Sequence, residues 1–480
     1  MEKSPEKTKF RARLLIDQKK HRVILAEVCR DFVDVLFSLL TLPMGTIIRL
    51  LEKHKKSQTV GCFNNIYKSV SDMVVDDFET EACKSMLLYP RSTKEIHYRR
   101  LKLNIDDTED AKFFTCPLYY RISCRQYTNF NTSKCSCGEL MIRQIEVSEE
   151  EQLGGPIGND EDGVFVSCRS SYIVTDDLKV TLSSLGVISN VLNGLGYAGF
   201  DDLQEVLVDI GFEEVLALLG NFFATEYPLT RTFLKKFVVV TPKKRLFTRG
   251  PKVEHVKGGH ECNVKLFIRK IDRKILYAEC SEDFIDSLLT FLALPLELAW
   301  SLSNDSSILG CVGNLCKSQC RGALSSPSWE IPYHYTCGEQ VLDIPPQPPV
   351  VYECVHSLSS LNLVRKVVNR KMVPSRMIIK MSPRDPKIKT GTPPTYGTGF
   401  VKRDTKFIVS DDLVITPMRS SSTINLFKNS VVSIGDLEEQ TISISKPELI
   451  SILRASFISR SALTNGLSNM VRKKQVLGTV

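Results

Sequence analysis

Residues 22–44 read RVILAEVCRDFVDVLFSLLTLPM, and residues 274–296 read KILYAECSEDFIDSLLTFLALPL. The two segments align without a gap, 252 positions apart. The identities run through the whole segment and include Ala26, Asp31, Phe32, Asp34 and Pro43, which match Ala278, Asp283, Phe284, Asp286 and Pro295. Self-similarity at a constant offset is the signature of internal duplication. The sequence therefore predicts two homologous units in tandem.

Hydrophobic periodicity predicts the local structure of this segment. Short apolar and β-branched runs at residues 11–17 and 22–28 predict a β-hairpin. Asp31 is expected to cap the helix that follows, because its carboxylate can accept hydrogen bonds from first-turn N–H groups. Pro43 ends that helix and suits the first turn of the next. A further helix over residues 61–70 recurs at residues 310–318.

A second repeated block gives the order of elements in each unit. Residues 172–181, YIVTDDLKVT, match residues 407–416, FIVSDDLVIT, and predict a strand, an Asp-Asp turn and a second strand. We expect an α+β fold in which each unit has a hairpin-plus-helices subdomain followed by a strand-plus-helices subdomain. The expected boundaries are 9–237 for the first unit, 238–262 for a basic linker and 263–470 for the second unit. A cysteine-containing module is expected at about 89–145.

Composition limits the class of protein. Hydrophobic residues make up 42% of the 480 residues and charged residues 25%, which is typical of a globular protein. The net charge of +8 and the pI near 8.7 fall short of a dedicated nucleic-acid binder. No apolar run reaches the length of a membrane span, and residues 1–13 lack a secretory signal, so we expect no membrane partner. Fifteen cysteines without an export signal indicate reduced thiols in the cytoplasm or the nucleus.

Four cysteines form the candidate metal site. Cys116, Cys124, Cys135 and Cys137 lie in an otherwise irregular module, where four thiolates can bind zinc tetrahedrally and supply order that a small core cannot. The single residue between Cys135 and Cys137 departs from the usual spacing of two to four. The second unit keeps only Cys337. The alternative interpretation is four free buried thiols.

Other motifs favour structural roles. Residues 194–199, GLGYAG, match G-x-G-x-x-G but follow a predicted helix, so they indicate helix termination rather than phosphate binding. The pairs Asp176/Asp177 and Asp411/Asp412 indicate turns, and Asp31/Asp34 and Asp283/Asp286 indicate helix starts. Cys62 and Cys311 are equivalent, and we expect both to be buried and inert. None of the seven histidines recurs at equivalent positions, so no catalytic set is shared by the two units.

The repeated strings resemble a known family. Residues 22–51, residues 172–181 and the closing string EEVLALLGNFFATEYPLTRTFL at residues 213–234 are similar to the plant family catalogued as a domain of unknown function, number 674. The resemblance covers residues 9–467 in two copies. It implies a plant protein, often built from repeated units, and supplies no active site to carry over.

Three classes of function follow from these observations. The first is a non-catalytic intracellular interaction or regulatory protein with a protein partner, because the duplicated residues include no reactive set. The alternative is a zinc-structured nucleic-acid-binding protein, in which arginines beside tyrosines of the cysteine module hold and stack bases: Arg99, Arg100, Arg121 and Arg125 with Tyr119, Tyr120 and Tyr127. The third is an enzyme with a site between the units, and no residue pattern supports it.

Overall fold

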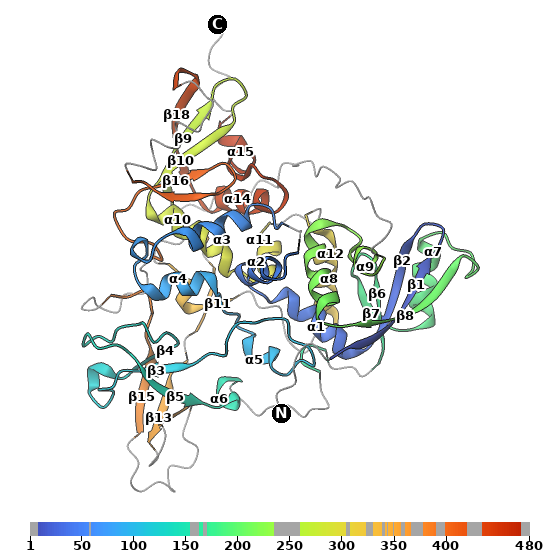
Figure 1. Cartoon of the computed structure of the whole chain (residues 1–480), viewed down its shortest axis with the longest axis horizontal. Coiled ribbons are helices and arrows are strands. Elements are labelled where there is room, and N and C mark those ends of the chain that lie inside the picture. The colour runs from blue at the N-terminus through green and yellow to red at the C-terminus, as the bar shows by residue number, and fades with distance from the viewer. Residues whose placement is uncertain are drawn as a thin grey trace.

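The computed structural model describes residues 8–56, 59–153, 163–166, 170–234, 260–303, 308–322, 330–337, 341–342, 344–348, 350–356, 361–365, 378–389, 399–419 and 434–471. Helices and strands both contribute large parts of this structure, so the expected α+β class is confirmed. In Figure 1 one sheet lies at the right, a second at the top and a barrel at the lower left, around a central group of helices.

The two open sheets have the same spatial order of strands. The first has the order β7-β6-β2-β1-β8, with β1 Phe10–Asp17, β2 Arg22–Val28, β6 Tyr172–Thr175, β7 Val180–Leu182 and β8 Leu203–Ile210. The second has the order β17-β16-β10-β9-β18, with β9 Cys262–Arg269, β10 Ile275–Cys280, β16 Phe407–Ser410, β17 Ile415–Pro417 and β18 Leu437–Ile444. The hairpin and the later strands share one sheet, so each unit is not divided into the two subdomains that we expected.

Helices fill the space between the sheets. Those of the first half are α1 Arg30–Leu40, α2 Met44–Lys53, α3 Phe63–Asp72, α4 Glu81–Leu88, α5 Glu95–Tyr98, α6 Glu149–Leu153, α7 Leu185–Gly194, α8 Phe212–Ala224 and α9 Pro228–Phe233. Those of the second half are α10 Glu282–Thr290, α11 Leu296–Ser303, α12 Gly310–Gly322, α14 Lys446–Ile458, α15 Ala462–Gly466 and α16 Ser468–Val471. Short 3-10 turns are η2 Val75–Asp77, η3 Ile122–Cys124, η4 Phe291–Ala293, η5 Tyr333–Tyr335 and η7 Ile434–Asp436. One hydrophobic core runs through both halves.

Helix α1 begins two residues earlier than the sequence suggested. Its N-cap is Cys29, and no side chain caps it. Asp31 lies inside the first turn, where its charge still suits the positive end of the helix dipole. The expected capping role of Asp31 is therefore wrong, although the helix itself and its apolar face are as predicted.

Equivalent residues of the two halves contact each other reciprocally. Met44 N donates to Leu294 O at 2.9 Å, and Leu296 N donates to Leu42 O at 3.0 Å. The same reciprocity holds where each half's third helix meets the other half's sheet: Ile415 N donates to Ser69 Oγ at 2.9 Å, and Val180 N donates to Ser318 Oγ at 3.0 Å. The contacts thus obey an approximate two-fold relation, as in an isologous interface.

Asp34 and Asp286 hold loops rather than helix starts. Asp34 is buried in α1 and accepts hydrogen bonds from Val164 N at 3.0 Å, Phe165 N at 2.7 Å and Val166 N at 2.9 Å. Asp286, in α10, accepts from the corresponding residues Phe400 N and Val401 N at 2.8 and 3.1 Å. The interpretation of these two residues as helix-start residues is therefore wrong, because their carboxylates satisfy backbone donors that burial removes from water.

The third sheet is a closed barrel with strands from both halves. Its order is β13-β14-β5-β3-β4-β15, with β3 Phe113–Thr115, β4 Gln126–Thr128, β5 Arg143–Val147, β13 Tyr352–His356, β14 Leu361–Val364 and β15 Ile378–Pro383. The pairs β14–β5 and β15–β4 are parallel and join the halves, and β11 Ile331–Pro332 pairs with β12 Pro346–Gln347 nearby. Of the expected linker 238–262, only residues 260–262 are described.

Candidate metal centre

Three short segments at one end of the barrel carry the four candidate cysteines. Cys116 directly follows β3, and Cys124 is the last residue of η3, just before β4. Cys135 and Cys137 lie in the turn between β4 and β5. Because β3 pairs with both β4 and β5, the sheet brings all three segments to the same place.

The turn that carries Cys135 and Cys137 is closed by backbone contacts. Cys135 N donates to Glu139 O at 2.8 Å, and Lys134 forms an isolated bridge with Leu140. Gly138 has a φ of 96°, a conformation that glycine adopts without a steric penalty. The backbone therefore holds the two sulfur atoms in fixed positions.

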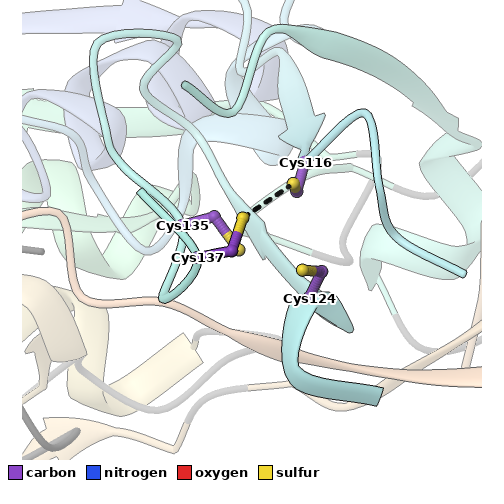
Figure 2. Close-up of side chains that lie close together, drawn as sticks. All are labelled: Cys116, Cys124, Cys135 and Cys137. Atoms are coloured by element: carbon purple, nitrogen blue, oxygen red, sulfur yellow. Dashed lines mark hydrogen bonds between the residues drawn. The ribbon is translucent and has the colours of Figure 1, made fainter. Parts of the chain in front are cut away.

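The four sulfur atoms converge (Figure 2). All four Sγ atoms lie within 4.8 Å of one another, and those of Cys116 and Cys137 are 3.6 Å apart. A tetrahedral zinc ion with Zn–S bonds of about 2.3 Å requires sulfur separations of about 3.8 Å. The donor set thus has the composition and dimensions of a four-thiolate site. Met141 and Leu118 pack against it.

The thiols differ in their acidity. Burial raises the pKa of the Cys116 and Cys135 thiols above the ordinary value. Burial acts on Cys137 in the same sense. Hydrogen bonds from the Glu139 backbone and from neighbouring thiols outweigh burial there, so the pKa of Cys137 is lowered. Cys137 is exposed while the other three are buried, which leaves one side of the cluster open to solvent.

A buried arginine from the second half lies beside the cluster. Arg384 follows β15 and is 2% exposed, and its Nη1 lies 3.3 Å from Ser136 Oγ and 3.4 Å from Gln126 Oε1. Its Nε and Nη2 are buried, and neither has a hydrogen-bond partner among the described residues. Burial lowers the pKa of Arg384, and Cys135, Asp385 and Cys137 oppose that shift by their charge. Zinc with four thiolates carries a net charge of −2, which this cation would partly neutralise.

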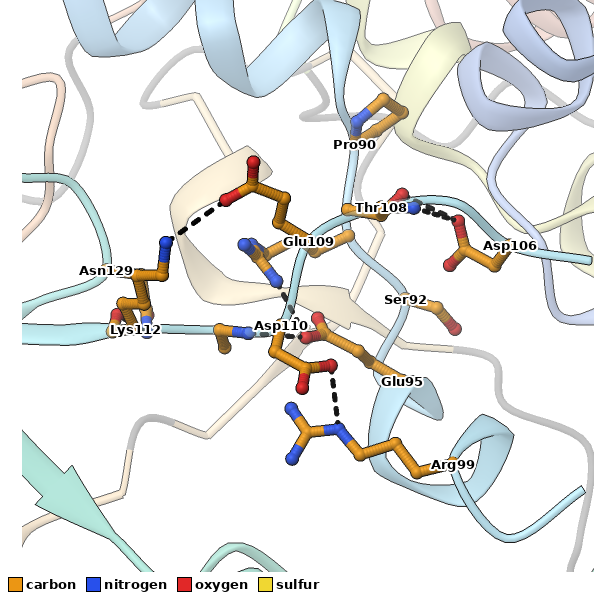
Figure 3. Close-up of polar contacts among 12 residues, drawn as sticks. Pro90, Ser92, Glu95, Arg99, Asp106, Thr108, Glu109, Asp110, Lys112 and Asn129 are labelled. Carbon is orange, nitrogen blue, oxygen red and sulfur yellow. Dashed lines mark hydrogen bonds and ion pairs between the residues drawn. The ribbon is translucent and has the colours of Figure 1, made fainter. Parts of the chain in front are cut away.

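Hydrogen bonds and an ion pair anchor the segment that leads into β3 (Figure 3). Glu95 Oε1 accepts from Arg91 Nη1 at 2.7 Å and from Ala111 N at 3.0 Å. Arg99 Nε pairs with Asp110 Oδ1 at 2.9 Å, and Asn129 Nδ2 donates to Lys112 O at 3.0 Å. These contacts fix the barrel, and with it Cys116, to the helical part of the molecule.

The glycine-rich motif terminates a helix, as predicted. Gly194 is the last residue of α7, and Gly196 has a φ of 81°. A phosphate cradle needs the motif before a helix, where N–H groups point outward. Its expected counterpart at residues 425–432 lies outside the described residues.

The aspartate pairs diverge, as predicted for turns, and their carboxylates also accept hydrogen bonds from residues distant in sequence. Asp177 accepts from Asn314 Nδ2 at 3.1 Å, whereas Asp176 is buried and accepts from Thr230 N at 2.9 Å. Asp411 repeats the arrangement and accepts from Thr464 N at 2.8 Å. The interpretation as turn residues alone was therefore incomplete for Asp176 and Asp411.

Cys62 and Cys311 are buried, as predicted. Burial raises the pKa of Cys62 to about 12, and its Sγ donates to Ser459 O at 3.0 Å. Cys311 Sγ donates to Phe222 O at 3.5 Å. Each thiol contacts the opposite half, which indicates a packing role.

The arginines and tyrosines of the nucleic-acid hypothesis do not form one surface. Tyr119 and Tyr127 are buried and only 5% and 4% exposed, so they offer no face for a base to stack on. Arg99 forms ion pairs with Asp110 and Glu149. Tyr120 is the tyrosine of this set that is exposed, at 53%.

Two cavities lie at contacts between the halves. One of about 450 Å³ lies between α3 and β17 and contains the ion pair of Asp77 with Arg419. One of about 170 Å³ lies beside the barrel and is lined by residues that include Tyr352 and His334. Burial lowers the pKa of His334 to about 3, so this imidazole is neutral at physiological pH.

The fold and the cysteine cluster define an α+β protein with two matching five-stranded sheets and a barrel that carries four convergent thiols. The family model described as "Protein of unknown function (DUF674)" matches residues 6–447, and the chain belongs to this family. No curated protein and no solved structure matches the chain. Among the described residues, no helix has the length and apolar character needed to cross a membrane.

Proposed function

We propose that this protein is a non-catalytic interaction or regulatory protein whose barrel is stabilised by one structural zinc ion. The carrying observation is the convergence of four cysteine sulfurs within 4.8 Å of one another. Structural zinc sites are closed sets of four protein ligands, whereas catalytic sites keep one position for water or substrate. Four thiolates and no histidine or carboxylate fit the structural type.

The wider arrangement supports a binding role rather than catalysis. The residues that match between the halves, such as Asp34 with Asp286 and Ser69 with Ser318, accept hydrogen bonds from backbone N–H groups. Their chemistry is therefore used to hold the fold. We also propose that the halves arose by tandem duplication, an idea supported by the equal strand orders and the reciprocal contacts.

We place the protein in the cytoplasm or the nucleus of a plant cell. The structure describes the side chains of thirteen cysteines, and all thirteen are free thiols, as in reducing compartments. The plant origin rests on the resemblance of the repeated strings alone.

Metal analysis of the purified full-length chain tests the zinc proposal. We expect about one zinc per chain, and little zinc in Cys124→Ser or Cys135→Ser, because three thiolates bind far more weakly than four. Cys354→Ser is the matched control, since Cys354 is a buried thiol of the same barrel outside the cluster. A wild-type chain that neither contains zinc nor takes it up under reducing conditions would establish free thiols instead.

Affinity capture tests the interaction role. A specific protein partner retained by the wild type and by Cys354→Ser, but lost from a zinc-free Cys124→Ser chain, would support binding through the barrel. Capture of no specific partner by the wild type would count against an interaction protein.

A further inference from the structure

The loops that carry the four cysteines hold four exposed apolar side chains. Ile122 is 82% exposed, Ile142 58%, Tyr120 53% and Leu140 44%. Exposed apolar patches on soluble proteins mark interaction sites more often than chance. We call these four residues the cysteine-loop tip.

The convergence of the four sulfurs brings together the two loops that carry the cysteine-loop tip. Tyr120 and Ile122 lie within four residues of Cys124, and Leu140 and Ile142 lie within five residues of Cys137. Figure 2 shows Cys124 at the end of its turn, facing the loop of Cys135 and Cys137. In Figure 1 the neighbouring strands β3 and β4 lie at the left margin of the molecule, remote from the first sheet.

Basic residues surround this tip. Residues 116–143 contain four basic residues and one acidic residue, Glu139, although the whole chain has 63 basic and 55 acidic residues. Arg121, Lys134 and Arg143 are exposed, and none of them forms an ion pair within the described parts of the chain. Arg143 is held over the Tyr119 ring at 4.9 Å. The surface thus offers unpaired positive charge beside exposed apolar groups.

We infer that the cysteine-loop tip docks on a membrane surface that contains anionic lipids. The isoleucines and Leu140 would enter the boundary between headgroups and acyl chains, and the three cations would contact headgroup phosphates and carboxylates. This inference goes beyond the proposed interaction function, because it adds a lipid surface to the protein partner that affinity capture tests. It also revises the expectation of no membrane partner, which rested on span length and does not bear on peripheral docking.

The chemistry of the tip favours lipid over nucleic acid. Nucleic-acid grooves combine cations with several aromatic faces on which bases stack, whereas here Tyr119 and Tyr127 are buried and only Tyr120 of the three is exposed. Contact with a phosphate backbone buries little of the apolar surface of isoleucine and leucine. Transfer of these side chains into an acyl environment is favourable, because it removes that surface from water. Neither of the two cavities described above is lined by residues of the cysteine-loop tip.

Vesicle co-sedimentation of the full-length chain tests the inference. The probes are vesicles of phosphatidylcholine alone and of phosphatidylcholine mixed with phosphatidylserine. We expect binding to the anionic vesicles that weakens as salt is raised. Ile122→Ser should weaken binding roughly tenfold or more, and Arg121→Gln roughly fivefold. Ile271→Ser, at an isoleucine that is 84% exposed in the β9–β10 turn, should have no effect.

Two outcomes would overturn the inference. Failure of the wild type to bind anionic vesicles is one, and equal binding by wild type, Ile122→Ser and Ile271→Ser is the other. Binding to single-stranded nucleic acid that ignores Ile122→Ser, without vesicle binding, would assign the cations to nucleic acid. Zinc content measured on the same preparation separates the two proposals, because a zinc-loaded chain that ignores vesicles refutes only the docking surface.

Discussion

Replacing Asp286 by asparagine tests how α10 holds the segment before β16. The Asp286 side chain is 4% exposed, and its Oδ1 accepts hydrogen bonds from Phe400 N at 2.8 Å and Val401 N at 3.1 Å. Asparagine keeps an accepting oxygen and nearly the same volume, and it cannot ionise. The variant therefore isolates the cost of a buried negative charge.

The pKa of Asp286 sets the size of the effect. Burial raises it from 3.8 to about 7, and the two backbone hydrogen bonds only partly oppose the shift. Because the folded-state pKa is above the unfolded value, the folded protein holds the proton more tightly. The contribution of protonated Asp286 to the unfolding free energy is fully present below about pH 4. It is lost as the pH rises through about 7. Between about pH 5 and about pH 8, this one group should cost the wild type about 2–3 kcal/mol of unfolding free energy.

Urea denaturation at both pH values measures the difference between variant and wild type. Between about pH 5 and about pH 8, we expect the unfolding free energy of Asp286→Asn to rise by about 2–3 kcal/mol relative to that of the wild type, because the variant lacks this titration. Asp209→Asn, at an exposed aspartate of β8, controls for the general loss of a carboxylate. The same difference at both pH values would refute the assignment of a strongly raised pKa to Asp286.

The remaining predictions concern contacts between the halves. Asn314→Ala removes hydrogen bonds from Nδ2 to Asp177 O at 2.9 Å and Asp177 Oδ2 at 3.1 Å, and we expect a loss of about 1–2 kcal/mol in urea denaturation. Asn65→Ala removes the equivalent hydrogen bond, from Asn65 Nδ2 to Asp412 O at 2.7 Å. The double variant should show additive losses of unfolding free energy, since the two sites share no partner. Unchanged stability in both single variants would contradict the reciprocal contacts. Gly61→Ala places a Cβ 1.8 Å from Ser456 O at a φ of 51°, so thermal unfolding should show a loss of about 3 kcal/mol or more. Gly186→Ala, with no atom within 4 Å of its Cβ, should unfold like the wild type, and equal stability of the two variants would reject the close approach.

Local patterns were sufficient for much of the fold. The hairpin β1–β2, helix α1, the strand pairs β6–β7 and β16–β17, and the end of α7 at Gly194 follow from periodicity and from turn residues, because each depends on neighbours in sequence. The edge strands β8 and β18 were missed, since each pairs along one edge only and carries exposed polar residues that weaken the alternating pattern.

The candidate metal centre shows the same division between local and distant information. The four cysteines were found from their clustering in the chain, since all lie within residues 116–137. Arg384 was not found, because it comes from the other half and no local motif marks it. Asp34 and Asp176 were assigned to helix starts and turns for a similar reason: their partners, Phe165 and Thr230, are distant in sequence.

The amino-acid sequence by itself determined the β1–β2 hairpin, helix α1, the repeated strings and the clustering of the four cysteines, because these depend on composition and spacing along the chain. Tertiary structure alone decided that each half's helix completes the other half's sheet, that strands of both halves close one barrel, and that a buried cation lies beside the sulfurs. The physical reason is that hydrogen bonds and burial between segments hundreds of residues apart depend on which surfaces remain unsatisfied after local folding. Pairing between such distant segments produces no periodic pattern in the sequence of either one.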